Sequence, residues 1–250
     1  MEAAGLGIFM VSACAFGALL WHPDSPVSRI VADGVGRRGL MGFAMGLTLL
    51  GIVYSPWGKQ SGAHLNPAVT LTFLRLGKVQ PWDAFFYVLA QFAGGVAGVI
   101  LSVSLLGAAL QHPSVHYVVT VPGETGVGVA FVAEVAIAFV MMTTVLVVSN
   151  GPRARWTGLF AGALVVAYIT FESPFSGMSL NPARTLGSAL PAMTWTALWL
   201  YFTAPPLGML AAAQVYLGMR STRAVHCAKL HHQNSKRCIF CQGRLALGQA

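Results

Sequence analysis

The C-terminal stretch has residue types and spacing that suit metal binding. It reads HCAKLHHQNSKRCIFC over residues 226–241. Its potential ligands are Cys227, His231 or His232, Cys238 and Cys241. Three thiolates and one imidazole suit the tetrahedral coordination of a structural zinc ion, and His231 is our first choice of histidine. A disulfide is less favoured, because we expect this tail in a reducing compartment. The other interpretation is a disordered basic tail whose thiols are incidental.

A second polar pattern occurs twice, each time at the edge of an apolar run. The triplet Asn66-Pro67-Ala68 in HLNPAVTLTF returns 115 residues later as Asn181-Pro182-Ala183 in MSLNPARTLG. Asn is a strong N-cap residue and Pro favours the first helical position, so each triplet predicts the start of a helix. The residues that follow are too few to cross a bilayer, so we expect two half-helices. If these enter from opposite faces, their positive dipole ends meet in mid-membrane.

The loops before the two triplets, SGAHL and SGMSL, must then run non-helically at membrane depth. Irregular backbone there is tolerated only when protein buries it or when it lines a watery cavity. The repeated pattern therefore indicates a pore.

The elements that must position these residues are very apolar. The chain of 250 residues is 56% hydrophobic and only 9% charged, whereas about a quarter of a soluble domain is charged. Six segments have the composition of membrane-spanning helices, which need about 20 residues. They are residues 2–21, 39–55, 82–108, 126–149, 157–171 and 195–217. The sequence therefore predicts an all-α integral membrane protein and disfavours a soluble fold.

The net charge of +8 does not indicate a nucleic-acid-binding protein, because the basic residues are unevenly placed. With a cytoplasmic N-terminus and six crossings, most of them fall on the cytoplasmic side, and only Arg29, Arg37 and Arg38 fall outside. Such an excess of Lys and Arg inside sets the orientation. We therefore expect a multi-pass protein of the plasma (inner) membrane with both termini cytoplasmic. The basic tail also favours contact with anionic lipid heads of the bilayer.

The two halves of the chain repeat one another. Each opens with a glutamate early in an apolar helix, Glu2 or Glu134, and continues through a second helix, a triplet and a third helix. NPAVTL and NPARTL match at five of six positions. Three crossings per half invert the second half, which puts a shared site near the bilayer midplane. We place a channel domain at 1–218, with repeats at 1–110 and 126–218, and a basic Cys/His-rich tail at 219–250.

On these motifs the chain resembles the aquaporin family, also called the major intrinsic proteins. The resemblance covers residues 2–218 and includes SGAHLNPAVT, SGMSLNPARTLGSALP and both glutamates. It implies six transmembrane helices plus two re-entrant half-helices in an inverted three-helix repeat. It also implies a homotetramer with one pore per subunit. Permeation involves no bond chemistry, so we predict no enzyme and no cofactor for transport. The short loops and compact size favour a bacterial member.

The resemblance implies a role for each motif residue. Asn66 and Asn181 would donate side-chain N–H bonds to the permeating molecule, and Arg184 would stand in the outer constriction. Buried Glu2 and Glu134 would accept bonds from loop N–H groups and hold the half-helices. A ladder of backbone carbonyls would come from Gly62, Ala63, His64, Leu65, Gly177, Met178, Ser179 and Leu180. Such acceptors replace hydrogen bonds that a solute loses on leaving water, while Arg184 and the helix dipoles repel cations.

The family's outer constriction decides which solute passes. Its four positions fall on Met45, Ile169, Met178 and Arg184. Strict water channels usually carry Phe and His at the first two, and glycerol channels carry Trp and Gly, so this chain departs from both. Thr185, Ala189 and the pair Tyr201-Phe202 resemble water channels. We therefore favour water, with glycerol, urea or hydrogen peroxide as the alternative solutes.

Other functions stay open at this point. A secondary transporter can share inverted repeats, but it needs a coupling acid in the path, and both deep glutamates are assigned to the loops. An intramembrane enzyme needs a nucleophile–base pair, which no motif here resembles. A sensor or adhesion protein could keep the fold without conducting. Within the pore, Arg184 could instead pair with Glu172, and His64 could act as a pH gate, although we expect His64 to be structural.

Overall fold

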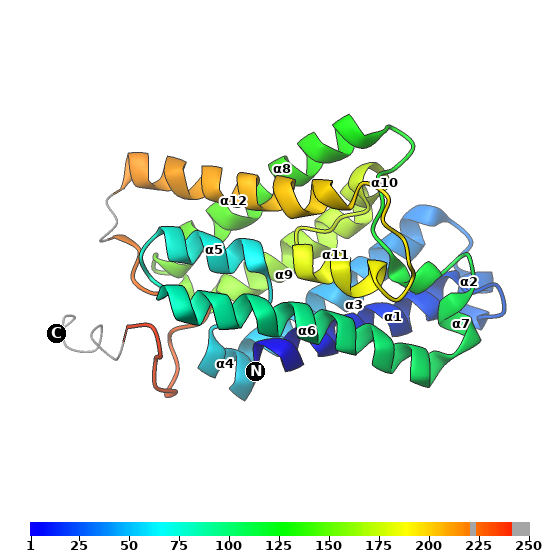
Figure 1. Ribbon diagram of the computed structural model, residues 1–250, viewed down its shortest axis with the longest axis horizontal. Helices are drawn as coiled ribbons and strands as arrows, with labels where there is room; N and C mark the ends of the chain where they lie inside the picture. The colour runs from blue at the N-terminus through cyan, green and yellow to red at the C-terminus, as the bar shows by residue number, and fades with distance from the viewer. Residues whose placement is uncertain (221–223, 242–250) are drawn as a thin grey trace.

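The computed structural model describes residues 1–220 and 224–241, and all regular structure in that part of the chain is helical (Figure 1). The six long helices are α1 (Glu2–Trp21), α3 (Gly34–Tyr54), α6 (Pro81–Leu106), α8 (Val127–Ser149), α9 (Thr157–Ala167) and α12 (Leu198–Met219). Two short helices are α5 (Pro67–Arg75) and α11 (Pro182–Ala189). Smaller turns are α2 (Pro26–Ile30), α4 (Pro56–Ser61), α7 (Ala108–Gln111), η1 (His116–Val118), η2 (Ala154–Trp156) and α10 (Ser173–Ser176). The predicted tail is described only in part, because residues 221–223 and 242–250 lie outside the described residues.

The long helices overlap all six predicted membrane segments. Four stretches are long and apolar enough to cross a bilayer by length and composition alone: Glu2–Trp21, Pro81–Leu106, Val127–Ser149 and Ala154–Ser176. Helices α3 and α12 are as long, at 21 and 22 residues, but have a lower mean hydropathy. The first turns of α3 carry two arginines, and α12 contains Pro205 and Pro206. The all-α membrane class predicted from composition is confirmed.

Local capping explains where the helices depart from the predicted bounds. Helix α3 begins at Gly34, before the predicted residue 39, because the Asp33 side chain accepts from the Gly36 N–H. Helix α12 begins three residues after the predicted start, because Ala197 has a left-handed backbone (φ 49°). The predicted segment 157–171 is α9 followed by a π-helical turn, η3 (Tyr168–Glu172).

The helices pair in a pattern that follows the sequence repeat. The most extensive contacts join α1 to α6 and α8 to α12, which are the first and third long helices of each half. The second long helices, α3 and α9, meet each other across the two halves. The arrangement is therefore the same in both halves, as an inverted repeat requires.

Each half-helix is held largely by the other half of the chain. Helix α11 packs most extensively on α6, and α5 packs most extensively on α12. Figure 1 shows α5 and α11 lying nearly end to end between α6 and α12. Both begin at the predicted Asn-Pro pair, with Asn66 and Asn181 as N-caps. Their N-termini consequently face each other near the middle of the molecule.

Two glycines at equivalent places in the repeat let the paired helices touch backbone to backbone. A Cβ atom on Gly94 of α6 would lie 2.1 Å from the Ala3 carbonyl oxygen of α1. A Cβ atom on Gly208 of α12 would lie 2.3 Å from the Val135 carbonyl oxygen of α8. Small residues allow this kind of close approach between membrane helices. The approach also sets the position of Glu2 and Glu134, which precede Ala3 and Val135 directly.

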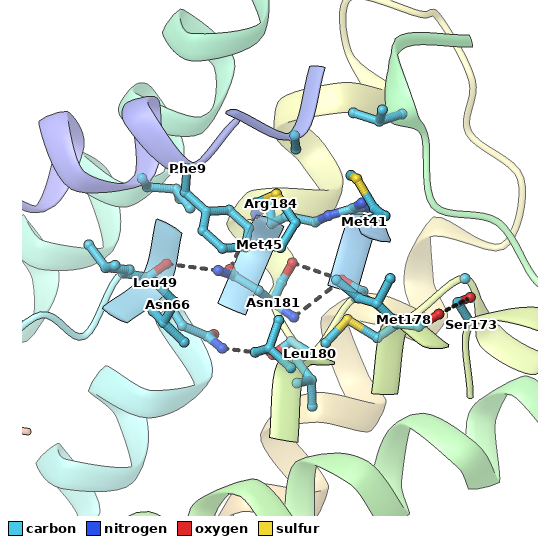
Figure 2. A pocket seen from close by; sticks show the side chains of 18 of the residues that line it. Phe9, Met41, Met45, Leu49, Asn66, Ser173, Met178, Leu180, Asn181 and Arg184 are labelled. Atoms are coloured by element: carbon cyan, nitrogen blue, oxygen red, sulfur yellow. Dashed lines mark hydrogen bonds between the residues drawn. The ribbon is translucent and has the colours of Figure 1, made fainter. Parts of the chain in front are cut away.

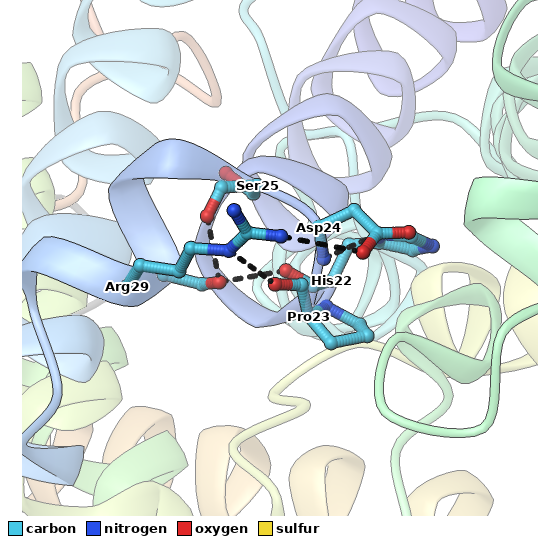
Figure 3. Close-up of polar contacts among 6 residues, drawn as sticks. His22, Pro23, Asp24, Ser25 and Arg29 are labelled. Carbon is cyan, nitrogen blue, oxygen red and sulfur yellow. Dashed lines mark hydrogen bonds and ion pairs between the residues drawn. The ribbon is translucent and has the colours of Figure 1, made fainter.

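The segment between α1 and α3 is a compact polar turn (Figure 3). Arg29 Nη2 lies 3.4 Å from Asp24 Oδ1, and Arg29 Nε donates to the Pro23 carbonyl at 3.2 Å. Both charged side chains are largely exposed, so the pair adds little stability. It is the only ion pair within residues 1–220 and 224–241, so the alternative in which Arg184 pairs with Glu172 is not what the structure shows.

Replacing Gly94 with alanine should destabilise the protein by about 1–3 kcal/mol, because its Cβ would overlap backbone that cannot move without separating α1 from α6. We expect a lower thermal unfolding midpoint in detergent, measured by intrinsic tryptophan fluorescence. Gly51→Ala in α3 is the matched control, since nothing lies within 4 Å of its Cβ position. A Gly94→Ala protein as stable as the control would contradict this close approach.

Candidate pore and tail cluster

A cavity of about 430 Å³ lies inside the molecule, and residues of both halves line it. Its wall includes Asn66, Asn181 and the loops before them, together with all four predicted constriction residues. Helix α3 contributes a stripe of apolar side chains to another part of the wall, at Met41, Met45 and Leu49. The cavity therefore has a polar wall of loop backbone and asparagine amides and an apolar wall of helix side chains.

The two asparagines bind each other's loops across the centre of the cavity (Figure 2). Asn66 Nδ2 donates to the Leu180 carbonyl at 2.7 Å, and Asn181 Nδ2 donates to the Leu65 carbonyl at 2.7 Å. Asn66 Oδ1 accepts from the N–H of Ala68 at 2.8 Å as an N-cap, and Asn181 Oδ1 caps α11 in the same way. The caps fix each amide so that its N–H groups face the centre. The second N–H of each amide remains available to a solute.

Glu2 satisfies the buried polar groups of the first loop. Its carboxylate accepts from Leu65 N at 2.6 Å, His64 N at 3.3 Å, Ser61 Oγ at 2.7 Å and Gln91 Nε2 at 2.8 Å. The glutamate itself is only 4% exposed. Buried backbone N–H groups outside helices need such partners, so this one carboxylate replaces the hydrogen bonds that a regular element would supply.

Glu134 does the same for the second loop. It is fully buried and accepts from Ser179 N at 2.6 Å, Leu180 N at 2.8 Å and Ser176 Oγ at 2.9 Å. The Tyr201 hydroxyl adds a bond to the Ser176 carbonyl at 2.6 Å. The two carboxylates thus make equivalent bonds to equivalent residues of the two halves.

The loops adopt a backbone that only such anchoring can maintain. Ala63, Leu65, Met178 and Leu180 all have φ between 53° and 58°. A left-handed conformation costs a non-glycine residue about 1–3 kcal/mol. The carboxylate bonds offset this cost in both loops. The pattern of left-handed residues is the same in the two loops, although their sequences differ.

Most of the predicted carbonyl ladder has no protein donor. Within residues 1–220 and 224–241, none of the donors bonds to the carbonyl oxygens of five loop residues: Ala63, His64, Gly177, Met178 and Ser179. Leu65 and Leu180 accept from the opposite asparagine. Gly62 departs from the prediction, because its carbonyl accepts from Leu230 N of the tail at 3.1 Å and the residue does not line the cavity. The loop sequence could not show that the tail covers this end.

The four residues predicted for the constriction all line the cavity: Met45, Ile169, Met178 and Arg184. Arg184 Nη1 is buried and has no hydrogen-bond partner among the described residues. In Figure 2, Met41 lies beside Arg184 and Met45. Sequence reasoning missed Met41 and Phe9, which also line this space. The spacing of four between Met41 and Met45 is the signal that places both on one helix face.

The structure brings the predicted tail cysteines together but corrects the histidine. The ligand atoms of Cys227, His232, Cys238 and Cys241 lie within 4.8 Å of one another. His231 instead packs edge-on against Tyr54, with ring centroids 4.9 Å apart. Neighbouring side chains in an extended segment point in opposite directions, so only one of the two histidines can face the cysteines. Hydrogen bonding from Cys227 lowers the pKa of the Cys238 thiol below its ordinary value.

Comparison with known proteins agrees with this architecture. The family model "Major intrinsic protein" matches residues 3–216. Aquaporin NIP1-3 of Oryza sativa subsp. japonica is 38% identical over 180 residues, covering 71% of this chain and 60% of that protein. Aquaporin NIP2-3 of Zea mays is 37% identical over 229 residues, covering 90% of this chain and 73% of that protein. Both are plant proteins, so the expected bacterial source gains no support.

A solved structure shows the same fold. The aquaglyceroporin from Plasmodium falciparum matches with a TM-score of 0.71 at 20% identity, covering 89% of this chain and 96% of that one. The matched family model spans both halves of the repeat and both capped half-helices. The chain therefore belongs to the major intrinsic protein family, whose members are channels and not enzymes.

Proposed function

We propose that the chain is a passive channel that conducts water in single file through this cavity and excludes ions and protons. The observation that carries the proposal is the pair of capped asparagines, Asn66 and Asn181, which come from opposite halves and face one cavity. The pore motifs are the two triplets, whose Pro67, Ala68, Pro182 and Ala183 start α5 and α11 behind these amides. A channel for small neutral solutes such as glycerol, urea or hydrogen peroxide is the alternative.

The two walls of the cavity have different tasks in this proposal. Water entering the pore loses hydrogen bonds, and the donor-free carbonyls of Ala63, His64, Gly177, Met178 and Ser179 replace part of them. The apolar side chains of α3 on the other wall offer no such bonds. A molecule is therefore held on one side only, which keeps binding weak and passage fast.

Cations are excluded by fixed positive charge. The N-termini of α5 and α11 face each other at the centre, and each carries the positive end of a helix dipole. Arg184 adds a full charge in the constriction, where its Nη1 has no partner among the described residues. A hydronium or metal cation would meet both, whereas neutral water would not.

The constriction supports the alternative solutes as well. Met45, Ile169 and Met178 are flexible or aliphatic, and none of them offers a hydrogen bond that would select water. Selectivity then depends on width and on Arg184 alone. We favour water because Thr185 and Tyr201-Phe202 are the residue types that water channels carry at these positions. Measured glycerol uptake decides between a water channel and a channel for larger neutral solutes.

The setting of the channel is part of the proposal. We place it in the plasma (inner) membrane as a homotetramer with both termini cytoplasmic, supported by the charge asymmetry and by large exposed apolar side chains such as Trp82, Phe86, Val132 and Phe171. Residues 1–218 form the channel domain. No cofactor takes part in transport, and a structural zinc ion in the tail would lie outside the permeation path.

Stopped-flow light scattering on proteoliposomes tests the function. We expect osmotic water flux well above that of empty liposomes, with a low activation energy, and glycerol uptake at the empty-liposome level. Substantial glycerol uptake would replace water selectivity with the alternative. Flux that saturates or depends on a proton gradient would indicate a transporter.

Replacing Arg184 with valine removes the charge from the constriction without removing a structural bond, since its guanidinium Nη1 is unpartnered among the described residues. We expect a several-fold rise in urea permeability, measured by stopped-flow light scattering, or in proton permeability, measured with a pH-sensitive dye inside the proteoliposomes. Water flux should be kept. Arg29→Gln in the exposed outer turn is the matched control. Unchanged permeability to both urea and protons would show that Arg184 takes no part in selectivity.

Glu134→Ala should abolish folding or water flux. It leaves two buried backbone N–H groups unpaired, at a cost of about 1–3 kcal/mol each. Glu134→Gln keeps an acceptor oxygen and should give an intermediate yield of folded protein by size exclusion. Glu124→Gln, on the exposed loop before α8, should resemble the wild type. A fully active Glu134→Ala channel would show that the loop does not need this carboxylate.

A further inference from the structure

The described part of the tail, residues 224–241, covers one end of the cavity. Leu230 N donates to the Gly62 carbonyl at 3.1 Å, and the Leu230 side chain lines the cavity and is only 6% exposed. His64 Nε2 donates to the Ala228 carbonyl at 2.8 Å. These contacts all involve the loop that precedes Asn66. Figure 1 shows the tail at the end of the molecule that also holds the N-terminus and α4.

An aromatic stack completes the contact between tail and loop. The His64 ring lies between Phe73 of α5 and Phe240 of the tail, with ring centroids 5.2 Å and 5.5 Å away and interplanar angles of 19° and 2°. The donor-free His64 carbonyl belongs to the same residue. The position of the tail therefore bears directly on a backbone group that lines the cavity.

The tail reaches this position with almost no regular structure of its own. The described tail residues contain no strand and no helix longer than a turn. Even so, several of their side chains are buried, including Lys229 at 2% exposure, whose Nζ donates to the Arg237 carbonyl at 3.3 Å. A segment this short, with no regular structure, gains stability from a cross-link or a bound metal.

Four side chains of the tail are placed to bind a metal ion. Cys227 Sγ and Cys238 Sγ lie 3.3 Å apart, His232 Nε2 and Cys241 Sγ lie 3.1 Å apart, and all four ligand atoms fall within 4.8 Å of one another. Tetrahedral zinc with Zn–S bonds of about 2.3 Å needs sulfurs about 3.8 Å apart. The Cys227–Cys238 separation is about 0.5 Å shorter than this, so a small side-chain movement would let three thiolates and an imidazole bind one tetrahedral ion.

The ligands alternate with the residues that touch the loop. Ala228 and Leu230 lie between the ligands Cys227 and His232, and Phe240 lies between Cys238 and Cys241. One bound ion would therefore fix all three contacts at once. Without the ion, no regular element in the described tail would hold these residues in place.

We infer that Cys227, His232, Cys238 and Cys241 bind one zinc ion, and that this ion holds the tail as a plug over the Gly62–Leu65 end of the pore. The plug rests on the proposed channel function, whereas the zinc site does not. With zinc bound, Leu230 and the stacked Phe240 narrow the entrance. Loss of zinc frees the tail and opens the entrance of the pore.

The zinc site is tested by elemental analysis of the full chain purified under reducing conditions. We expect one zinc per chain in the wild type and in His231→Gln, and far less in His232→Gln and Cys238→Ser. Cys14→Ser, in α1, is the matched cysteine control and should keep its zinc. A zinc-free wild type, or a Cys227–Cys238 disulfide found by mass spectrometry under these conditions, would overturn the site.

Docking of the tail has a readout that needs no transport. Lys229 is buried, so trypsin should cut after it only once a membrane-permeant zinc chelator has been added. Added zinc should restore protection. Equal cleavage with and without the chelator would overturn the zinc-dependent docking.

The plug is tested by water flux in the same proteoliposomes. We expect chelation to raise the flux several-fold and added zinc to reverse the rise. Cys238→Ser should have the same water flux as the chelated wild type, and added zinc should not change it. Phe240→Ala should keep its zinc but show the raised water flux without any chelator. A zinc-loaded wild type with unchanged flux on chelation would overturn the plug. Flux at the empty-liposome level in every condition would reject the channel function, while zinc content and trypsin protection still decide the site.

Discussion

The structure depends on satisfying the backbone of two irregular loops that cross the protein interior. A helix pairs its own backbone N–H groups, but these irregular loops cannot pair theirs. Glu2 and Glu134 accept the loop N–H groups with both carboxylate oxygens. The backbone N–H groups of each loop therefore point toward its glutamate. The carbonyl oxygens of the loop remain available to the cavity. The polar wall of the pore follows from how the loops are anchored.

The two halves of the chain stabilise each other by exchanging their half-helices. Helix α11 lies on α6 and α5 lies on α12, and the asparagine at each N-terminus bonds to the loop of the other half. The exchange requires the paired long helices to approach closely, which Gly94 and Gly208 permit. Neither half can form the asparagine bonds alone, because the acceptor for each asparagine amide comes from the other half.

The tail adds a second level of organisation to this frame. It bonds to Gly62 and His64, at the one loop whose end is accessible to it, and it does so through residues that sit between potential metal ligands. The helical bundle and the cysteine cluster are therefore parts of one arrangement. A change in the cluster would alter the position of the loop, because the tail residues between the ligands contact Gly62 and His64 directly.

The sequence by itself determined the membrane class, the six long segments and the two capped half-helices, because hydropathy and N-cap preferences are local properties of the chain. The internal repeat singled out the two glutamates, and the family resemblance implied their role. It also located the tail cysteines. Tertiary structure alone decided that Asn66 and Asn181 bond to Leu180 and Leu65, that the tail takes the Gly62 carbonyl, and that His232 rather than His231 joins the cluster. Each of these outcomes depends on which groups distant in sequence meet in space, and on which way a side chain points in an extended segment. No local pattern encodes either.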